Sequence, residues 1–226
     1  MNDLAIVIFS CDKNEELWPI FRTLLDKYWP NHPKAYLLTE TKSSSLFGTI
    51  VYNYDLQYWT LRIRECLKLI DKTKVIFICD DVFLNAPVNI KKLNKCIELL
   101  DNNPNLASIN FEMFYDPKDI DTKYYGFRQK TPNSLFVLSF LCGIWNKDKL
   151  IDLLSVKVCD PWTLEDDQNY KDYDYYIVSE EKVLSWFRDG PYEMGALYRG
   201  KWNKDVVKFL EEENIKVDFD KKGFRE

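Results

Sequence analysis

The stretch Lys74-Val-Ile-Phe-Ile-Cys79-Asp80-Asp81 decides the fold. Its unbroken apolar run, rich in β-branched and aromatic residues, predicts a short strand that is buried on both faces, as in the middle of a parallel sheet covered by helices. The run stops at two adjacent carboxylates. In open α/β sheets, ligands bind beyond the carboxyl ends of the strands. We therefore expect Asp80 and Asp81 to lie at the functional edge of such a sheet.

Outward from this strand, apolar runs and amphipathic segments alternate along the first half of the chain. Strands are expected at 4–9, 35–39, 49–53, 74–79 and 106–111, and helices at 17–29, 57–71 and 89–102. This order predicts an α/β fold with a mostly parallel central sheet and helices on both faces. In the second half we expect a strand at 135–141, a helix at 146–154 and a last strand at 215–219. No linker or repeat interrupts the pattern, so we expect one domain over 1–226.

Composition excludes several classes of function. The 226 residues are 46% apolar, which allows a sizeable core, and carry a net charge of −5. So acidic a chain is a poor candidate for nucleic-acid binding. The only histidine, His32, argues against multi-histidine zinc sites and against a Ser-His-Asp triad. The chain enters a strand at Leu4 without a visible leader, and we expect a cytoplasmic protein.

Polar loops follow three of the expected strands, after Phe9, Thr39 and Cys79. The carboxylates of Asp80 and Asp81 suit Mg²⁺ or Mn²⁺, which prefers oxygen ligands. The alternative is that they only cap the following turn. Asp12, in the loop that begins with Ser10, could hold a nucleobase or ribose, or could equally cap a helix.

Two further segments could carry chemistry. Residues 160–167 form an acidic cluster beside Trp162, where Glu165 or Asp166 could act as a general base, or where the acids could simply favour a helix N-terminus. In the segment Arg199-Gly200-Lys201, two cations flank a glycine that would allow close approach of a phosphate. Solvated basic residues are the plainer interpretation of that segment. Trp59 and Arg62 form another cationic and aromatic group.

With these motifs in place, the chain resembles the small bacterial glycosyltransferases of the GT-A fold. The resemblance spans nearly the whole chain and rests on these elements: Trp59-x-x-Arg62, Cys79-Asp80-Asp81-x-Phe83, Gly143-Ile144-Trp145-Asn146, Pro161-Trp162-x-x-Glu165 and Gly200-Lys201-Trp202. It implies a UDP-linked sugar donor and a glycan or lipid-linked glycan acceptor in surface-polysaccharide assembly. It also implies a donor-binding half at 1–110 and an acceptor-side half at 111–226.

The resemblance implies a role for each candidate residue. Asp81 would hold Mn²⁺ or Mg²⁺, with Asp80 near the donor ribose or sugar. Glu165 or Asp166 would be the base of an inverting transfer. The remaining donor-side positions are Ser10, Asp12, Thr39, Trp59, Arg62, Arg199 and Lys201.

Two alternatives stay open. A sugar-phosphate nucleotidyltransferase shares the order of elements, although the loop after the first strand lacks the glycine-rich basic sequence of those enzymes. A non-catalytic nucleotide- or glycan-binding subunit would bind ligand without turnover. A lipid-linked acceptor would bring the protein to the inner face of the membrane. Anionic lipid could then meet the basic residues Lys91, Lys92, Lys95, Lys221, Lys222 and Arg225.

Overall fold

The computed structural model describes residues 2–52, 58–114, 116–166, 172–187 and 195–225. The chain divides into two compact units that alternate along the sequence. Unit 1 comprises Met1–Asp12, Pro33–Cys79 and Asn89–Val183, and unit 2 comprises Lys13–His32, Asp80–Val88 and Leu184–Glu226. Position 110, where we expect donor-binding and acceptor-side halves to meet, lies inside unit 1.

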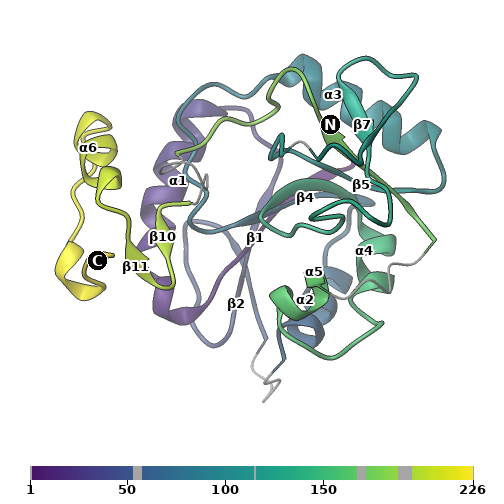
Figure 1. Cartoon of the computed structure of the whole chain (residues 1–226). Helices are drawn as coiled ribbons and strands as arrows, with labels where there is room; N and C mark the ends of the chain where they lie inside the picture. The colour runs from purple at the N-terminus through teal and green to yellow at the C-terminus, as the bar shows by residue number, and fades with distance from the viewer. Residues whose placement is uncertain (1, 53–57, 115, 167–171, 188–194, 226) are drawn as a thin grey trace. The chain divides into compact units, whose positions relative to one another are not determined.

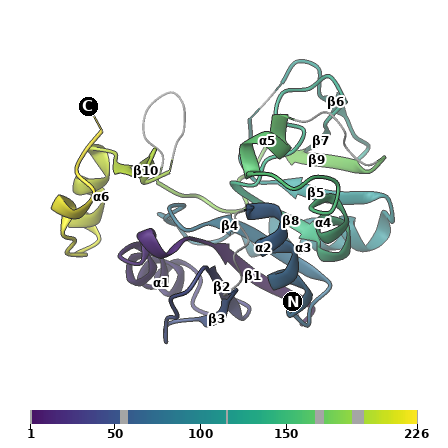
Figure 2. The same ribbon diagram turned by 90° about the horizontal axis from the view of Figure 1, so that it is seen from below.

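Unit 1 contains a nine-stranded sheet, and Figure 2 follows it from β3 to β6. In spatial order its strands are β3 (Gly48–Val51), β2 (Ala35–Thr39), β1 (Leu4–Phe9), β4 (Lys74–Cys79), β8 (Cys142–Asn146), β5 (Leu106–Asn110), β9 (Asp174–Val178), β7 (Phe127–Gln129) and β6 (Ile120–Asp121). Only β8 and β7 run against the others. The predicted α/β class with a mostly parallel central sheet is confirmed.

Helices cover both faces of this sheet (Figure 1). On one face lie α2 (Trp59–Lys68), α4 (Lys147–Leu153) and the short α5 (Pro161–Asp166), and their apolar side chains share a core with Val75 and Phe77 of β4. On the other face α3 (Ile90–Asn102) packs against β5 and β8. The successive side chains of β4 from Val75 to Ile78, which point to opposite faces, are all at most 3% exposed, as the unbroken apolar run requires.

The expected strand at 135–141 is wrong. Leu135 and Phe136 are exposed, and Phe136 has a backbone φ of 52°. The strand is the next segment, β8, which fits antiparallel between β4 and β5. A Cβ on Gly143 would lie 3.0 Å from the carbonyl oxygen of Ile109 in β5, so this register needs a glycine. Apolar content alone did not reveal that requirement.

Among the residues of unit 2 that the structure describes are α1 (Leu17–Tyr28), the hairpin of β10 (Leu197–Tyr198) and β11 (Lys201–Trp202), α6 (Asp205–Glu212) and a 3₁₀ turn at Phe219–Lys221. The Tyr28 hydroxyl donates to the Glu213 carboxylate over 2.5 Å, which joins the end of α1 to the end of α6. The expected strand at 215–219 is absent; its last residue begins the 3₁₀ turn instead. Among the described residues, no helix is long and apolar enough to span a bilayer.

Candidate functional site

Several candidate residues of unit 1 lie at one edge of its sheet. Because β1, β2, β4 and β5 run in the same direction, their carboxyl ends meet at that edge. The edge therefore carries Ser10, Thr39 and Cys79. The antiparallel β8 starts there as well, since the backbone N–H of Cys79 donates to the carbonyl of Leu141 over 3.0 Å.

The carboxylate of Asp12 organises the loop that follows β2. It accepts hydrogen bonds from the backbone N–H groups of Glu40, Thr41 and Lys42 at 3.1–3.3 Å and from the Thr41 hydroxyl. Burial acts to raise the pKa of Asp12, but these hydrogen bonds outweigh it and hold the pKa below its usual range. Asp12 is thus an anion that joins the ends of β1 and β2.

Three other predicted donor-side residues surround the same loop. The Thr39 hydroxyl donates to the carbonyl of Lys42 over 2.5 Å. Arg62 is 9% exposed and places Nη1 3.8 Å from Oε1 of Glu40. The backbone N–H of Ser10 donates to the carbonyl of Leu38 in β2 over 3.0 Å, and its hydroxyl donates to the Cys11 carbonyl over 3.3 Å. The structure therefore brings Ser10, Asp12, Thr39 and Arg62 together at the ends of β1 and β2.

Trp59 belongs to an aromatic cluster rather than to this loop. Its ring lies 5.8 Å from that of Phe9 and 5.1 Å from that of Phe140, measured between centroids. Phe77 stacks on Phe9 at 4.6 Å. These four rings form one aromatic cluster that includes Phe140. The backbone of Phe140 in turn binds Glu165, one of the two predicted bases.

Glu165 and a second carboxylate, Glu112, meet at the start of β8. The backbone N–H of Phe140 donates to Oε1 of Glu165 over 2.7 Å, and the hydroxyl of the preceding residue, Ser139, donates to Glu112. Burial raises the pKa of Glu165 to about 7 against the opposing hydrogen bond from Phe140, and the nearby charges of Glu112 and Asp166 add to the rise. Glu165 is therefore poised to take up a proton near neutral pH.

Glu112 is a candidate that the sequence reasoning missed. It stands two residues beyond β5, and the side-chain amide of Asn110 holds its carboxylate at 2.9 Å. Asp81 stands at the same offset from β4, and that repetition was the available signal. Asp166 is exposed, as is Trp162, one helical turn before Glu165, with 73% of its surface accessible.

Asp80 and Asp81 follow β4 directly along the chain, belong to unit 2 and are held by other residues of that unit. Asp80 is 2% exposed and accepts a hydrogen bond from the Asn14 side chain over 3.3 Å. Oδ2 of Asp81 accepts from the backbone N–H of Leu197 over 3.4 Å, and its carbonyl accepts from Ala196 over 2.9 Å. Asp81 is thus tied to the first strand of the β10–β11 hairpin.

The donor set at this point suits a hard divalent cation. One ligand atom from each of Cys79, Asp80 and Asp81 lies within 4.8 Å of the other two. The two carboxylates match Mg²⁺ or Mn²⁺, whereas a thiolate does not. A Cβ on Gly195 would lie 2.6 Å from Oδ2 of Asp81, so the glycine keeps the space around this carboxylate clear. The residues fit a metal held by Asp80 and Asp81 without Cys79.

Arg199 and Lys201 lie on the same hairpin and are exposed. Arg199 and Gly200 form its two-residue turn with φ values of 49° and 79°. This conformation favours glycine, and the space around Gly200 is open to 4 Å. Gly200 is therefore explained by the turn, while the guanidinium of Arg199 lies over the ring of Tyr198 at 5.3 Å.

The basic groups considered for lipid contact are partly engaged within their own units. Lys92 is 8% exposed, and its ammonium donates to the carbonyl of Gly126 over 3.1 Å. Lys95 pairs with Glu98 at 2.9 Å, and Lys222 pairs with Glu16 at 3.1 Å. The ammonium groups of these three lysines therefore already have partners within the chain.

Comparison with known proteins gives a likeness of fold. No family model and no curated protein matches the sequence. Among solved structures, Staphylococcus aureus TarS 1–349 in complex with UDP-GlcNAc matches 97% of this chain and 69% of its own length, with a TM-score of 0.52 and 12% identity. The CMP:2-keto-3-deoxy-manno-octonic acid synthetase in complex with CTP matches 94% of this chain and 99% of its own, with a TM-score of 0.51 and 11% identity.

The lengths of other matched proteins differ more from that of this chain. It spans 52% of the bifunctional IspDF of Campylobacter jejuni and 60% of another S. aureus TarS 1–349 structure. At such low identity the likeness concerns architecture alone. The chain has the Rossmann-like α/β fold that is shared by the TarS and synthetase structures, as the resemblance implied.

Proposed function

We propose that this protein is a metal-dependent glycosyltransferase that moves a sugar from a UDP-linked donor to a hydroxyl of a glycan or lipid-linked glycan. The observation that carries the proposal is the Asp80-Asp81 pair directly after β4, in a fold shared with a UDP-GlcNAc-bound TarS. Surface-polysaccharide assembly is the setting that the family resemblance implies for this reaction.

In the proposed step, the acceptor oxygen forms a bond to the anomeric carbon while the bond from that carbon to the diphosphate oxygen breaks. The electron pair leaves with UDP, and the acceptor proton goes to the Glu165 carboxylate. Because the acceptor oxygen attacks in a single displacement from the face opposite the diphosphate, the anomeric configuration inverts. The hydrogen bond from the backbone of Phe140 fixes the carboxylate of Glu165, and the pKa of Glu165, about 7, suits proton transfer. We assign the base to Glu165 rather than to the exposed Asp166.

On the donor side, Asp81 and Asp80 would hold Mn²⁺ or Mg²⁺, which when bound neutralises charge on the departing diphosphate. Arg199 and Lys201 add positive charge on the hairpin to which Asp81 is hydrogen-bonded. Ser10, Asp12, Thr39, Trp59 and Arg62 are the proposed contacts of the nucleoside.

A release assay tests this proposal. The full chain is incubated with a panel of UDP-sugars, acceptor glycans and Mn²⁺, and free UDP is measured. We expect release from at least one donor, its loss on chelation of the metal, and a decrease of about 100-fold in Asp81→Asn. The exposed Asp205→Asn, in the same unit, should behave as the wild type. UDP release that survives both chelation and Asp81→Asn would contradict the assignment.

The base is tested separately. Glu165→Gln should lower transfer by about 10²–10⁴-fold while UDP binding is kept, because a positioned base contributes that much. Asp166→Asn is the matched control, one residue away. If Asp166→Asn showed the larger loss, the base would be Asp166.

The likeness to the synthetase, which covers 99% of that chain, favours nucleotidyl transfer as the second candidate. Such an enzyme would consume a nucleoside triphosphate and release pyrophosphate. The loop after β1 argues against nucleotidyl transfer, because its sequence, Ser10-Cys11-Asp12-Lys13-Asn14, contains no glycine. Release of pyrophosphate from CTP or UTP with a sugar or sugar phosphate, and no release of UDP from UDP-sugars, would select this candidate.

A further inference from the structure

Three exposed apolar side chains gather in the segment between β5 and β8. Phe114, Leu135 and Phe136 are 41%, 56% and 57% exposed. The rings of Phe114 and Phe136 meet edge to face, with centroids 5.2 Å apart and planes at 87°. We call these three residues the apolar platform. Grouped apolar side chains on a surface commonly mark a binding site.

A buried ionic network holds this platform in place. The ammonium of Lys130 lies 3.2 Å from Oδ2 of Asp119, and the two side chains are 1% and 0% exposed. The same ammonium donates to the carbonyls of Leu135 and Phe114 at 3.0 and 3.5 Å. Both arms of the platform therefore bind one buried cation.

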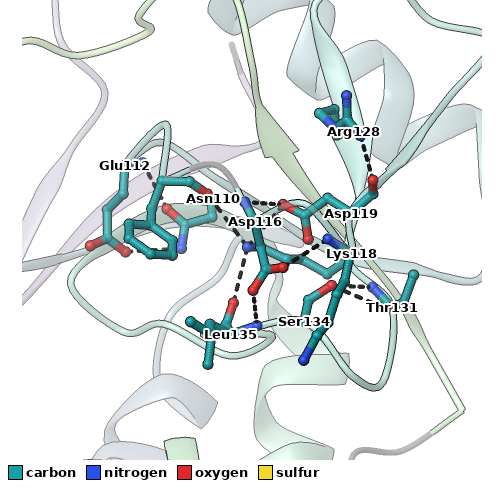
Figure 3. A network of polar contacts seen from close by, with 11 residues as sticks. Asn110, Glu112, Asp116, Lys118, Asp119, Arg128, Thr131, Ser134 and Leu135 are labelled. Carbon is teal, nitrogen blue, oxygen red and sulfur yellow. Dashed lines mark hydrogen bonds and ion pairs between the residues drawn. The ribbon is translucent and has the colours of Figure 1, made fainter.

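Asp116 adds a second tie beneath the platform. Its carboxylate accepts from the backbone N–H of Leu135 over 2.7 Å, and its own backbone N–H donates to the carboxylate of Asp119. Figure 3 shows both contacts. The guanidinium of Arg128 donates in turn to the Asp119 carbonyl. The side chains of the platform are thus exposed, while the backbone of Phe114 and Leu135 is held by hydrogen bonds from Lys130 and to Asp116.

The backbone is strained at Phe136 of the platform and at Met113, the residue before Phe114. Met113 and Phe136 have φ values of 54° and 52°, in the left-handed region that residues other than glycine rarely adopt. Such strain persists only where the surroundings enforce it, and it gathers at binding sites. Neither the strain nor the exposed rings contributes to the core of unit 1.

The platform residues lie close in sequence to Glu112 and to the residues that bind the carboxylates of Glu112 and Glu165. Phe114 comes two residues after Glu112, and Phe136 three residues before Ser139, whose hydroxyl donates to Glu112. At ~3.5 Å per extended residue, the Cα atoms of Phe114 and Phe136 lie within about 7 and 11 Å of those of Glu112 and Ser139. Glu165 is held by Phe140, the next residue. One or two sugar rings span such distances.

We propose that the apolar platform binds a pyranose ring of the acceptor and presents its hydroxyls to Glu112 and Glu165. The electron-rich faces of the phenyl rings attract the C–H face of a sugar, and the carboxylates accept hydrogen bonds from its hydroxyls. A hydrocarbon chain has no hydrogen-bond donors, so it offers these carboxylates nothing that a sugar hydroxyl offers. This inference rests on the proposed function and names its acceptor chemistry.

Saturation-transfer NMR on the full chain tests the platform directly. The probes are the methyl pyranosides of glucose, galactose, mannose and N-acetylglucosamine. The variants are Phe114→Ser and Phe136→Asn, since asparagine tolerates the left-handed backbone of residue 136. Tyr125→Ser is the control, because Tyr125 is an aromatic residue of unit 1 that is 86% exposed and lies outside the platform. Binding of UDP with Mn²⁺ is measured on each protein.

We expect saturation of the ring C–H protons of at least one pyranoside in the wild type and in Tyr125→Ser, with binding about tenfold weaker in both platform variants. UDP binding should be unchanged. Unaltered sugar binding in the platform variants, or no sugar binding to the wild type, overturns the proposal. Sugar binding that depends on the platform in a protein that does not bind UDP would uphold the platform and reject the proposed function. Platform-dependent binding to phosphatidylglycerol vesicles without sugar binding would assign the surface to lipid instead.

Discussion

At the scale of single residues, burial and hydrogen bonding give the carboxylates of unit 1 different characters. Asp12 accepts several hydrogen bonds, and its pKa lies below the usual range. Glu165 is largely buried and has like charges nearby, and these outweigh its hydrogen bond from Phe140, so its pKa is raised to about 7. Environments that separate the pKa values of carboxylates in this way are typical of acid–base sites. Only the folded chain shows which carboxylate is in which environment.

Glu165 should make the stability of the protein depend on pH. Its pKa is about 7 in the folded chain and 4.5 ordinarily. The folded state therefore holds the proton more tightly, and this contribution is fully present below pH ~4.5 and is lost as the pH rises through ~7. The loss should be up to about 3 kcal/mol, at ~1.4 kcal/mol per pKa unit.

Urea unfolding at pH 5 and pH 8 measures this effect. Glutamine cannot ionise, so the free energy of unfolding of Glu165→Gln should fall less between these pH values than that of the wild type. Asp166→Asn is the control. Equal pH dependence in the wild type and in Glu165→Gln would show that Glu165 has an ordinary pKa.

Lys130 should be among the residues of unit 1 on which stability depends most. Lys130→Met leaves the Asp119 carboxylate buried without its cation and should cost about 3–5 kcal/mol of unfolding free energy. The double variant Lys130→Met/Asp119→Leu removes both charges and should recover part of that loss. Chemical denaturation of the three proteins checks this. If the double variant lost the sum of two large single effects, the pair would not act as one unit.

At the scale of elements, the sequence predicted the strands and helices that hydrophobic periodicity marks. It missed the strand whose position depends on the close approach of two backbones. The apolar run of β4 and the amphipathic spacing of α3 identified those elements nearly to the residue. The run at 135–141 is equally apolar, yet it begins with the exposed Leu135 and Phe136, because the strand that fits between β4 and β5 is the one containing Gly143. Glu112 was missed since its partners, Asn110 and Ser139, come together only after β5 and β8 pair.

Gly143 should be intolerant of any side chain. In Gly143→Ala the new methyl group would lie 3.0 Å from the Ile109 carbonyl, and β8 cannot move without disturbing both neighbouring strands. We expect a loss of about 1–3 kcal/mol, as for other overpacked interiors. Thermal unfolding measures it, with Gly48→Ala, on the edge strand β3, as the milder control. Equal stability of Gly143→Ala and the wild type would contradict this register.

Gly195 should govern the metal site without contributing a ligand. The methyl group of Gly195→Ala would lie 2.6 Å from Oδ2 of Asp81 and should displace that carboxylate. We expect Mn²⁺ binding, followed by calorimetry in the presence of UDP, to weaken at least about tenfold. Gly200→Asn is the matched control, since the space around Gly200 is open and asparagine tolerates its positive φ. Equal weakening in both variants would show that the effect is not specific to Asp81.

At the scale of the whole molecule, the sequence predicted the α/β class and the edge of the sheet where polar residues gather. It did not predict the division into two units, because their boundaries fall at residues 12, 32, 79, 88 and 183, where no linker composition marks them. The candidate residues belong to both units. Asp12 and Glu165 are in unit 1, and Asp81 and Arg199 are in unit 2. The contacts described above for each of these residues are with other residues of its own unit.

The central claim is that Asp81 serves a metal and a nucleoside diphosphate. Titration calorimetry of the full chain with UDP and with CTP, each with and without Mn²⁺, tests it most directly in the wild type and in Asp81→Asn. We predict that UDP binds only with Mn²⁺, more tightly than CTP, and at least about tenfold more weakly in Asp81→Asn. UDP binding that needs neither Mn²⁺ nor Asp81, or no binding of UDP under any of these conditions, would contradict the account.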